Sequence, residues 1–166
     1  MAEKDFGKLE IRKAERRDAP VLLSLIKELA EYERMSDQVA TTEEMLTDNL
    51  FGKTGNIAEA VIACYNGAPV GMAIYFFNFS TFVGRRGLYL EDLFVQPALR
   101  GKGIGKALLI YLAKTAVENN CGRFEWSVLD WNKPAIDFYK SLGAKPMDEW
   151  TIFRLSGDEI KHVAGL

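Results

Sequence analysis

The order of helix and strand patterns along this chain predicts an α/β fold, with one mixed sheet that carries helices on both faces. Apolar residues alternate with polar ones in some segments and recur at helical spacing in others, in the order strand, two helices, three strands, helix, strand, helix, strand, helix. No repeat, low-complexity tract or linker interrupts that order. We therefore expect residues 1–166 to form a single domain.

The first third of the chain reads as a short strand followed by two helices. Residues 9–13 alternate apolar and charged side chains, as a half-buried strand does. Asp18 has the chemistry of an N-cap, for a helix that we expect to end near Glu33. Thr41 and Glu44 have capping-box spacing, which predicts a second helix from Thr41.

A β-hairpin is expected in the middle of the chain. Residues 57–65 and 68–79 are apolar runs that flank Asn66-Gly67, a strong signal for a two-residue turn. Residues 79–87 read as a loop rich in aromatic and basic side chains. The elements expected after this loop are a strand at 88–95, a helix at 103–119, a strand at 124–129, a helix from Asn132 or Asp130 to Gly143, a strand at 150–155 and a short terminal helix capped at Ser156.

The composition is that of an ordinary globular protein, with 48% hydrophobic and 27% charged residues. A formal net charge of −2 argues against a nucleic-acid or membrane partner, so any anion site must be local. The first residues are charged throughout, and no segment approaches the roughly 18 apolar residues of a membrane-spanning helix. We therefore expect a cytoplasmic protein.

The cysteine and histidine content predicts no metal. The spacing of Cys64 and Cys121 suggests neither a metal site nor a redox pair, and two buried free thiols are the expected state. His162 is the single histidine and lies near the C-terminus. A catalytic base must therefore be a carboxylate, a tyrosine, a thiol or an amine.

The stretch from residue 90 to residue 108 runs from an apolar strand, through a glycine-rich loop, into a helix. A helix start presents unpaired backbone N–H groups and the positive end of the helix dipole, so this order favours a bound phosphate. Gly101, Gly103 and Gly105 would let the backbone approach the phosphate closely. Positive charge would be added by Arg100, Lys102 and Lys106.

Two familiar phosphate loops do not match this stretch. A Walker A loop requires glycine where Arg100 stands and serine or threonine where Ala107 stands. A dinucleotide fingerprint requires glycine at the position of Lys106 or of Leu108. The spacing therefore excludes both nucleotide-binding readings.

Residues 100–105, R-G-K-G-I-G, match the Q/R-x-x-G-x-G/A signature and so resemble the GNAT superfamily of acetyl-CoA-dependent N-acetyltransferases. Similarity to its diamine branch, the spermidine/spermine and thialysine acetyltransferases, extends over LIKELAEYERMSDQV (25–39), YLEDLFV (89–95), VLDWN (128–132) and FYKSLGA (138–144). The resemblance implies a mostly antiparallel central sheet. It also implies direct acetyl transfer from acetyl-CoA to the primary amine of a diamine, a polyamine or a lysine analogue such as thialysine.

The resemblance also implies how the co-substrate acetyl-CoA is held. Backbone N–H groups of the glycine loop would cradle its pyrophosphate, and its pantetheine arm would lie along the strand that ends at Val95. The cofactor-binding residues implied are Leu93, Phe94, Val95, Arg100, Gly101, Lys102, Gly103, Ile104, Gly105, Lys106 and Asn132.

Acetyl transfer also needs a neutral amine, because an alkylammonium of pKa about 10.4 cannot attack. Glu91 and Asp92 are adjacent acids inside an otherwise apolar strand, and strand alternation would point them to opposite faces. The resemblance makes Glu91 the base, acting through water, with Asp92 the weaker candidate, and it assigns an oxyanion donor near Phe94. Periodicity alone would bury Tyr139, whereas the resemblance makes it the general acid for the departing thiolate.

Tyr32, Glu33, Glu91, Asp92 and Trp150 match positions that contact the amine in this branch. The loop before the catalytic strand departs from the polyamine-acetylating members at Ser80, Phe82 and Arg85-Arg86. This departure favours a shorter amine, such as a lysine analogue whose carboxylate would pair with an arginine. Acetylation of a protein amine and a non-catalytic acyl-CoA sensor stay as alternatives. The branch implies a homodimer, and the apolar region 150–155 is a candidate for its interface.

Overall fold

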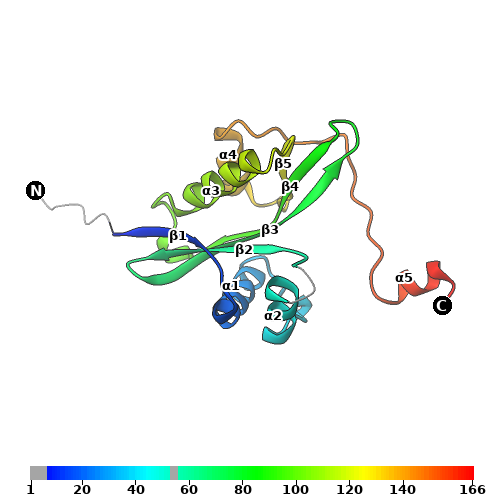
Figure 1. Cartoon of the computed structure of the whole chain (residues 1–166), viewed down its shortest axis with the longest axis horizontal. Helices are drawn as coiled ribbons and strands as arrows, with labels where there is room; N and C mark the ends of the chain where they lie inside the picture. The colour runs from blue at the N-terminus through cyan, green and yellow to red at the C-terminus, as the bar shows by residue number, and fades with distance from the viewer. Residues whose placement is uncertain (1–6, 53–55) are drawn as a thin grey trace, which may run out of the picture. The chain divides into compact units, whose positions relative to one another are not determined.

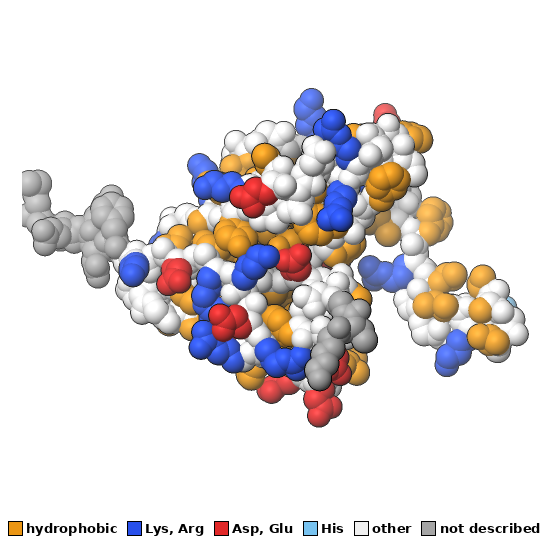
Figure 2. Space-filling view, viewed as in Figure 1, with side chains coloured by type: hydrophobic (Ala, Val, Ile, Leu, Met, Phe, Trp, Pro, Cys, Tyr) orange, Lys and Arg blue, Asp and Glu red, His pale blue; other side chains and the backbone are white. Residues whose placement is uncertain are grey.

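A computed structural model describes residues 7–52 and 56–166 of the chain. The chain divides into two compact units, Met1–Ser127 and Val128–Leu166, and each is described by itself (Figure 1). On the face shown in Figure 2, acidic and basic side chains of the first unit are interspersed. This distribution agrees with the small net charge of −2.

The first unit is built on a five-stranded sheet with the strand order β1-β2-β3-β4-β5. Neighbouring strands from β1 to β4 are antiparallel, and β5 is parallel to β4. The mixed, mostly antiparallel sheet is therefore confirmed. The strands are β1 (Leu9–Lys13), β2 (Glu59–Tyr65), β3 (Ala68–Ser80), β4 (Arg85–Val95) and β5 (Arg123–Trp126).

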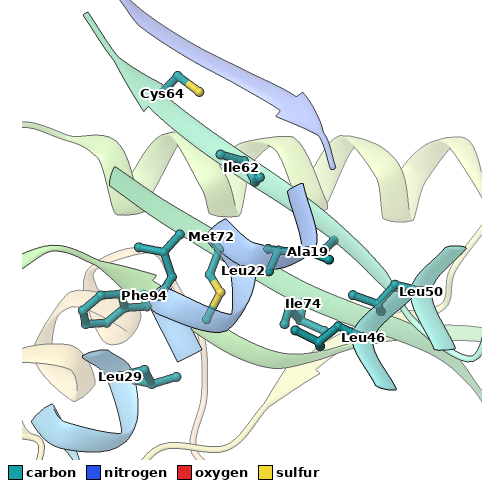
Figure 3. Close-up of a cluster of buried hydrophobic side chains, with 12 residues drawn as sticks. Ala19, Leu22, Leu29, Leu46, Leu50, Ile62, Cys64, Met72, Ile74 and Phe94 are labelled. Carbon is teal, nitrogen blue, oxygen red and sulfur yellow. The ribbon is translucent and has the colours of Figure 1, made fainter. Parts of the chain in front are cut away.

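Helices cover both faces of this sheet, as predicted (Figure 1). Helices α1 (Ala19–Tyr32) and α2 (Glu43–Phe51) lie on one face, and α3 (Ile104–Glu118) lies on the other. Successive residues of β2 and β3 point to opposite faces of the sheet, and the buried stretch of each strand is covered on both faces. Figure 3 shows the core between the sheet and α1 and α2, where Leu22, Ile62 and Met72 are fully buried.

The hairpin between β2 and β3 forms as the sequence predicts. Asn66 and Gly67 both have positive φ angles, 53° and 82°, which a tight two-residue turn requires. The loop predicted at residues 79–87 is wrong, because β3 continues to Ser80 and β4 begins at Arg85. Residues 78–80 pair with residues 85–87, and the aromatic run that suggested a loop has instead the high strand propensity of aromatic side chains.

Two predicted helix caps differ from those that form. The Asp18 carboxylate accepts hydrogen bonds from Arg12, at 2.7 and 2.9 Å, and from the Glu15 N–H, at 2.8 Å, so it ties β1 to the start of α1. The hydrogen bond from Arg12 is the main cause that holds the pKa of Asp18 below its usual range. Thr42, rather than Thr41, caps α2 by accepting from the Met45 N–H at 3.2 Å. Short 3-10 turns lie at Arg16–Asp18, Ser36–Gln38 and Pro97–Leu99.

The second unit contains α4 (Lys133–Ser141) and α5 (Asp158–Ala164). Asn132 caps α4 by accepting from the Ala135 N–H at 3.4 Å, and Gly143 follows the helix with a φ of 88°, as predicted. The strand predicted at residues 150–155 is wrong, since no residue of this unit is in a strand. A strand needs a neighbour for its backbone hydrogen bonds, and its own unit supplies none.

Cys64 is buried in β2 and Cys121 is only half-buried, and both are free thiols. His162 is exposed in α5. Within residues 7–52 and 56–166, no group of three or more His, Cys, Asp and Glu side chains is placed to hold a metal ion. Over the same residues, no helix is both long and apolar enough to cross a bilayer.

Candidate active site

The candidate site lies where β4 separates from β5. The two parallel strands pair over residues 87–90 of β4 and residues 123–126 of β5. Residues 91–95 of β4 continue beyond the end of β5, and residues 92–95 pair with β3 on their other side. This leaves one edge of β4 with backbone groups that an extended amide chain can pair with.

A β-bulge marks the point of separation. Leu90 pairs with Tyr75 and Asp92 pairs with Ile74, so Glu91 is an extra residue with no partner position on β3. The bulge places Glu91 in an exposed position, whereas Asp92 is half-buried. Both acids do lie inside the otherwise apolar strand, as the sequence shows, but they differ in exposure. Bulges are common next to active sites because they redirect a side chain.

Three carboxylates gather at this bulge. Burial raises the pKa of Asp92 to about 6, and the negative charges of Glu91 and Glu33 add to the effect. Glu33 caps the C-terminus of α1, is itself half-buried, and has its pKa raised by burial. We call Glu33, Glu91 and Asp92 the acid cluster. An ammonium group would relieve the repulsion within it.

The glycine loop opens α3 as predicted. Gly101 and Gly103 have φ angles of 78° and 80°, and Gly103 is the N-cap of α3. A Cβ atom added at either glycine would meet nothing within 4 Å, so open space lies beside the loop. The first N–H groups of α3 have no acceptor within the helix, and Lys106 is exposed in its first turn. These features fit a pyrophosphate.

Two of the loop cations lie on aromatic rings. The Arg100 guanidinium carbon is 4.1 Å from the centre of the Tyr32 ring, and Arg100 Nε donates to the Val95 carbonyl at 3.1 Å. The Lys102 ammonium is 4.9 Å from the centre of the Tyr65 ring. Both cations were expected to lie near a phosphate. No pattern in the sequence signals these long-range ring contacts.

Several residues expected to line the cofactor have side chains that belong to the hydrophobic core. Phe94 and Val95 are buried, as is Ile104 at the start of α3, and Leu93 is half-buried. Their side chains therefore pack the sheet. A ligand along the open edge of β4 would therefore meet the backbone of residues 93–95, where the Val95 carbonyl already accepts from Arg100 Nε.

Three predicted site residues, Asn132, Tyr139 and Trp150, belong to the second unit. Asn132 is half-buried and caps α4. Tyr139 is half-buried on α4, with its ring centre 5.5 Å from that of Phe138. Trp150 is 73% exposed.

The residues that suggested a short amine lie at the tip of the β3–β4 hairpin. The Ser80 hydroxyl accepts the Val83 N–H at 3.3 Å, and Phe82 is 99% exposed. Arg86 precedes Asp92 by six residues on the same strand, which separates them by about 20 Å. Within one chain, Arg86 is therefore too far from the acid cluster to pair with the carboxylate of an amino acid whose amine lies there.

A mixed sheet that opens beside β4, with an anion loop leading into α3, defines an acyl-CoA-dependent transferase. The chain belongs to the acetyltransferase (GNAT) family, whose model matches residues 22–144. It is therefore an acetyl-CoA-dependent N-acetyltransferase, and the expected family and fold are confirmed.

The relatives agree with the expected branch. A thialysine N-epsilon-acetyltransferase of Bos taurus is 42% identical over 165 residues, which cover 93% of this chain and 96% of the relative. An Arabidopsis thaliana enzyme named for acetylating L-ornithine is 43% identical over 56% of this chain and 41% of its own length. An integron cassette protein from the mobile metagenome of V. cholerae has 30% identity and a TM-score of 0.78, and the match covers 94% of this chain and 97% of that one.

Gly103→Ala is expected to raise the KM for acetyl-CoA about tenfold. A left-handed residue costs alanine roughly 1–2 kcal/mol, and relief of that strain would turn the first N–H groups of α3 away from the loop. Gly84→Ala is the matched control, since Gly84 also has a positive φ, 66°, with nothing within 4 Å of an added Cβ. Equal effects of the two variants on the KM would contradict a role for Gly103 in the loop.

Proposed function

We propose that this enzyme transfers the acetyl group of acetyl-CoA directly to the primary amine of a small lysine-like amino acid, of which thialysine is the leading example. The observation that carries this proposal is the acid cluster of Glu33, Glu91 and Asp92 at the bulge where β4 leaves β5. Relatives named for acetylating thialysine and L-ornithine support an amino-acid acceptor. A short diamine or a polyamine is the next substrate class.

The pyrophosphate of acetyl-CoA would bind the backbone N–H groups of residues 101–106, with Lys106 adding charge. The amides of the pantetheine arm would pair with residues 93–95 along the open edge of β4. Asn132 would be a further contact of the arm, as the family resemblance implies. The support is the left-handed Gly101 and Gly103, the open space beside them and the unpaired edge of the strand. The co-substrate supplies the thioester that the amine attacks.

The acid cluster would prepare the amine. At pH 7, an alkylammonium of pKa about 10.4 is deprotonated in roughly one molecule in 2500. The cluster would concentrate the ammonium form, and Asp92, with its pKa near 6, would accept the proton and pass it to solvent as the amine attacks. Exposed Glu91 would hold the water that carries this proton, so both acids would take part in the proton transfer.

The last two roles would fall to a backbone group and to Tyr139. A backbone N–H near Phe94, on the unpaired edge of β4, would donate to the oxyanion. Tyr139 would give its phenol proton to the departing thiolate, and Tyr32 and Trp150 would contact the amine substrate. Support for these assignments comes from the family motif FYK at residues 138–140 and from the position of Tyr32 beside Glu33.

A substrate panel tests the acceptor. Thiol release from acetyl-CoA would be measured with thialysine, lysine, ornithine, putrescine, spermidine and a lysine-containing peptide. The highest kcat/KM is expected for thialysine or another amino acid. A strong preference for spermidine would contradict the amino-acid acceptor, release with the peptide alone would indicate a protein acetyltransferase, and CoA binding without release would indicate a sensor.

We also propose that both units act as one acetyltransferase domain, because the family match over residues 22–144 crosses the boundary at residue 127. A cytoplasmic location is part of the proposal, supported by the two free thiols, which are typical of a reducing compartment.

A homodimer is proposed from the surface of the second unit. Residues 150–155 have a strand pattern but no strand neighbour within their unit, and Ile152 and Phe153 are 74% and 92% exposed. Hydrophobic side chains also cover much of the terminal segment around α5 (Figure 2). Exposed apolar surface of this extent is typical of an interface.

Phe153→Asp is expected to convert the dimer into a monomer in light scattering after size-exclusion chromatography. Leu166→Asp is the matched control, because Leu166 is 93% exposed at the chain end. A monomeric wild type, or a dimeric Phe153→Asp variant, would contradict the interface.

A further inference from the structure

The segment that follows β4 contacts α1 at two points. Gln96 Nε2 donates to both carboxylate oxygens of Glu28, at 3.2 and 3.1 Å. The Arg100 guanidinium lies over the Tyr32 ring at 4.1 Å. Glu28 and Tyr32 are four residues apart and therefore share one side of the helix. Gln96 and Arg100 flank the 3-10 turn Pro97–Leu99, so this turn spans the two contacts.

The Arg100 side chain is held by three contacts, two with aromatic rings and one hydrogen bond. It stacks on Tyr32, its guanidinium carbon lies 5.8 Å from the centre of the Phe94 ring, and its Nε donates to the Val95 carbonyl at 3.1 Å. A planar guanidinium can stack on a ring and donate in its own plane at the same time, whereas a lysine ammonium has no plane that could stack. The charge of Arg100 is therefore engaged at the end of β4 and the end of α1.

The contacts of Gln96 and Arg100 hold the last turn of α1. Tyr32 is the final residue of α1, and Glu33 is its C-cap. Glu33 is also the α1 member of the acid cluster, whose other two members are on β4. Because Arg100 and Gln96 join α1 to the end of β4, they fix the distance between Glu33 and the two acids of the bulge.

We propose that Arg100 and Gln96 form a clamp that positions Glu33 against Glu91 and Asp92, and that the Arg100 side chain serves the amine site rather than the pyrophosphate of acetyl-CoA. This inference rests on the proposed function of the acid cluster. It makes Arg100 a positioning residue, while the backbone of the loop and Lys106 hold the phosphates.

Arg100→Lys tests the clamp, because it keeps the positive charge and loses the planar stack. With the best amine of the panel, the KM for the amine is expected to rise about fivefold to tenfold, and the KM for acetyl-CoA to change less than twofold. The fall of kcat/KM at low pH is expected to move slightly to lower pH. Burial is the main cause that raises the pKa of Asp92, and only the smaller added effect of the Glu33 charge is lost. A purely structural role would lower the melting temperature without moving this fall of kcat/KM.

Lys106→Gln is the comparison for a phosphate ligand. It is expected to raise the KM for acetyl-CoA severalfold and to leave the KM for the amine within twofold. If Arg100→Lys instead behaves in this way, the clamp is wrong and Arg100 binds the pyrophosphate. Unchanged amine KM in Arg100→Lys also overturns the clamp.

The second contact gives an independent pair of variants. Glu28→Gln keeps an acceptor for Gln96 Nε2, and Glu28→Ala removes it. The amine KM of Glu28→Ala is expected to follow that of Arg100→Lys, and Glu28→Gln to lie nearer the wild type. Equal amine KM values for the two Glu28 variants would overturn the clamp.

Calorimetric binding of CoA separates this inference from the proposed function. This measurement needs no amine. It therefore tests the clamp even if no amine in the panel is acetylated, a result that would contradict the proposed function. Unchanged CoA affinity of Arg100→Lys supports the clamp, and a fivefold or greater loss overturns it.

Discussion

Tyr139→Phe is expected to lower kcat by an order of magnitude or more while acetyl-CoA still binds. The ring of Tyr139 is half-buried on α4, so phenylalanine keeps its packing and removes only the hydroxyl. Without that proton the departing group must leave as a thiolate, whose thiol has a reference pKa of about 8.5. Steady-state kinetics measures the turnover, and titration of CoA measures the binding.

Tyr111→Phe is the matched control, since Tyr111 lies on α3 and also loses only a hydroxyl. Its kcat is expected to stay within twofold of the wild type. An unchanged kcat in Tyr139→Phe would remove the phenol from the reaction. Loss of CoA binding in that variant would instead indicate damage to the cofactor site.

Asp92→Asn is expected to lower kcat/KM about a hundredfold, because removal of a general base commonly costs 10²–10⁴ in rate. In the wild type, kcat/KM should fall as the pH falls through about 6, where Asp92 takes up a proton and loses both its charge and its basicity. The kcat/KM of Asp92→Asn should not show this fall near pH 6. A pH series of initial rates measures both effects.

The stability of Asp92→Asn separates lost function from lost fold. The pKa of Asp92 is raised in the folded state, so the folded protein holds its proton more tightly than the unfolded chain. Ionisation of Asp92 therefore costs stability as the pH rises from about 4 to about 6. At pH 8, the uncharged asparagine is expected to melt at a higher temperature than the wild type.

Glu91→Gln decides between the two acids of the bulge. It is expected to lower kcat/KM less than Asp92→Asn does, and its kcat/KM should still fall as the pH falls through about 6. A larger loss in Glu91→Gln, with the fall near pH 6 retained in Asp92→Asn, would instead make Glu91 the base.

Features that depend on neighbouring residues were predictable from the sequence. The turn at Asn66-Gly67 forms because both residues tolerate positive φ, and α3 begins after Gly103 because the apolar spacing starts there. The same local order, a strand, a glycine loop and a helix, indicates the family. The clustering of Glu33 with Asp92 was accessible only through the family resemblance, because nothing in the spacing of α1 and β4 reports their distance.

Where strand and loop patterns are both possible, the sheet decides. The aromatic residues before Ser80 became part of β3 because β4 lies beside them, whereas residues 150–155 have a strand pattern and no strand neighbour in their unit. Strand formation depends on a partner for the backbone, and that partner is distant in sequence.

The sequence by itself determined the family, the glycine loop and the identity of the acids. Only the tertiary structure made Glu91 the extra residue of β4 and placed Asp92 in a half-buried position near Glu33. It also placed the Arg100 guanidinium over the Tyr32 ring. The reason is that a bulge is defined by the register of two strands, and a pKa by burial and by charges brought together from separate elements. Neither quantity exists until the chain has folded.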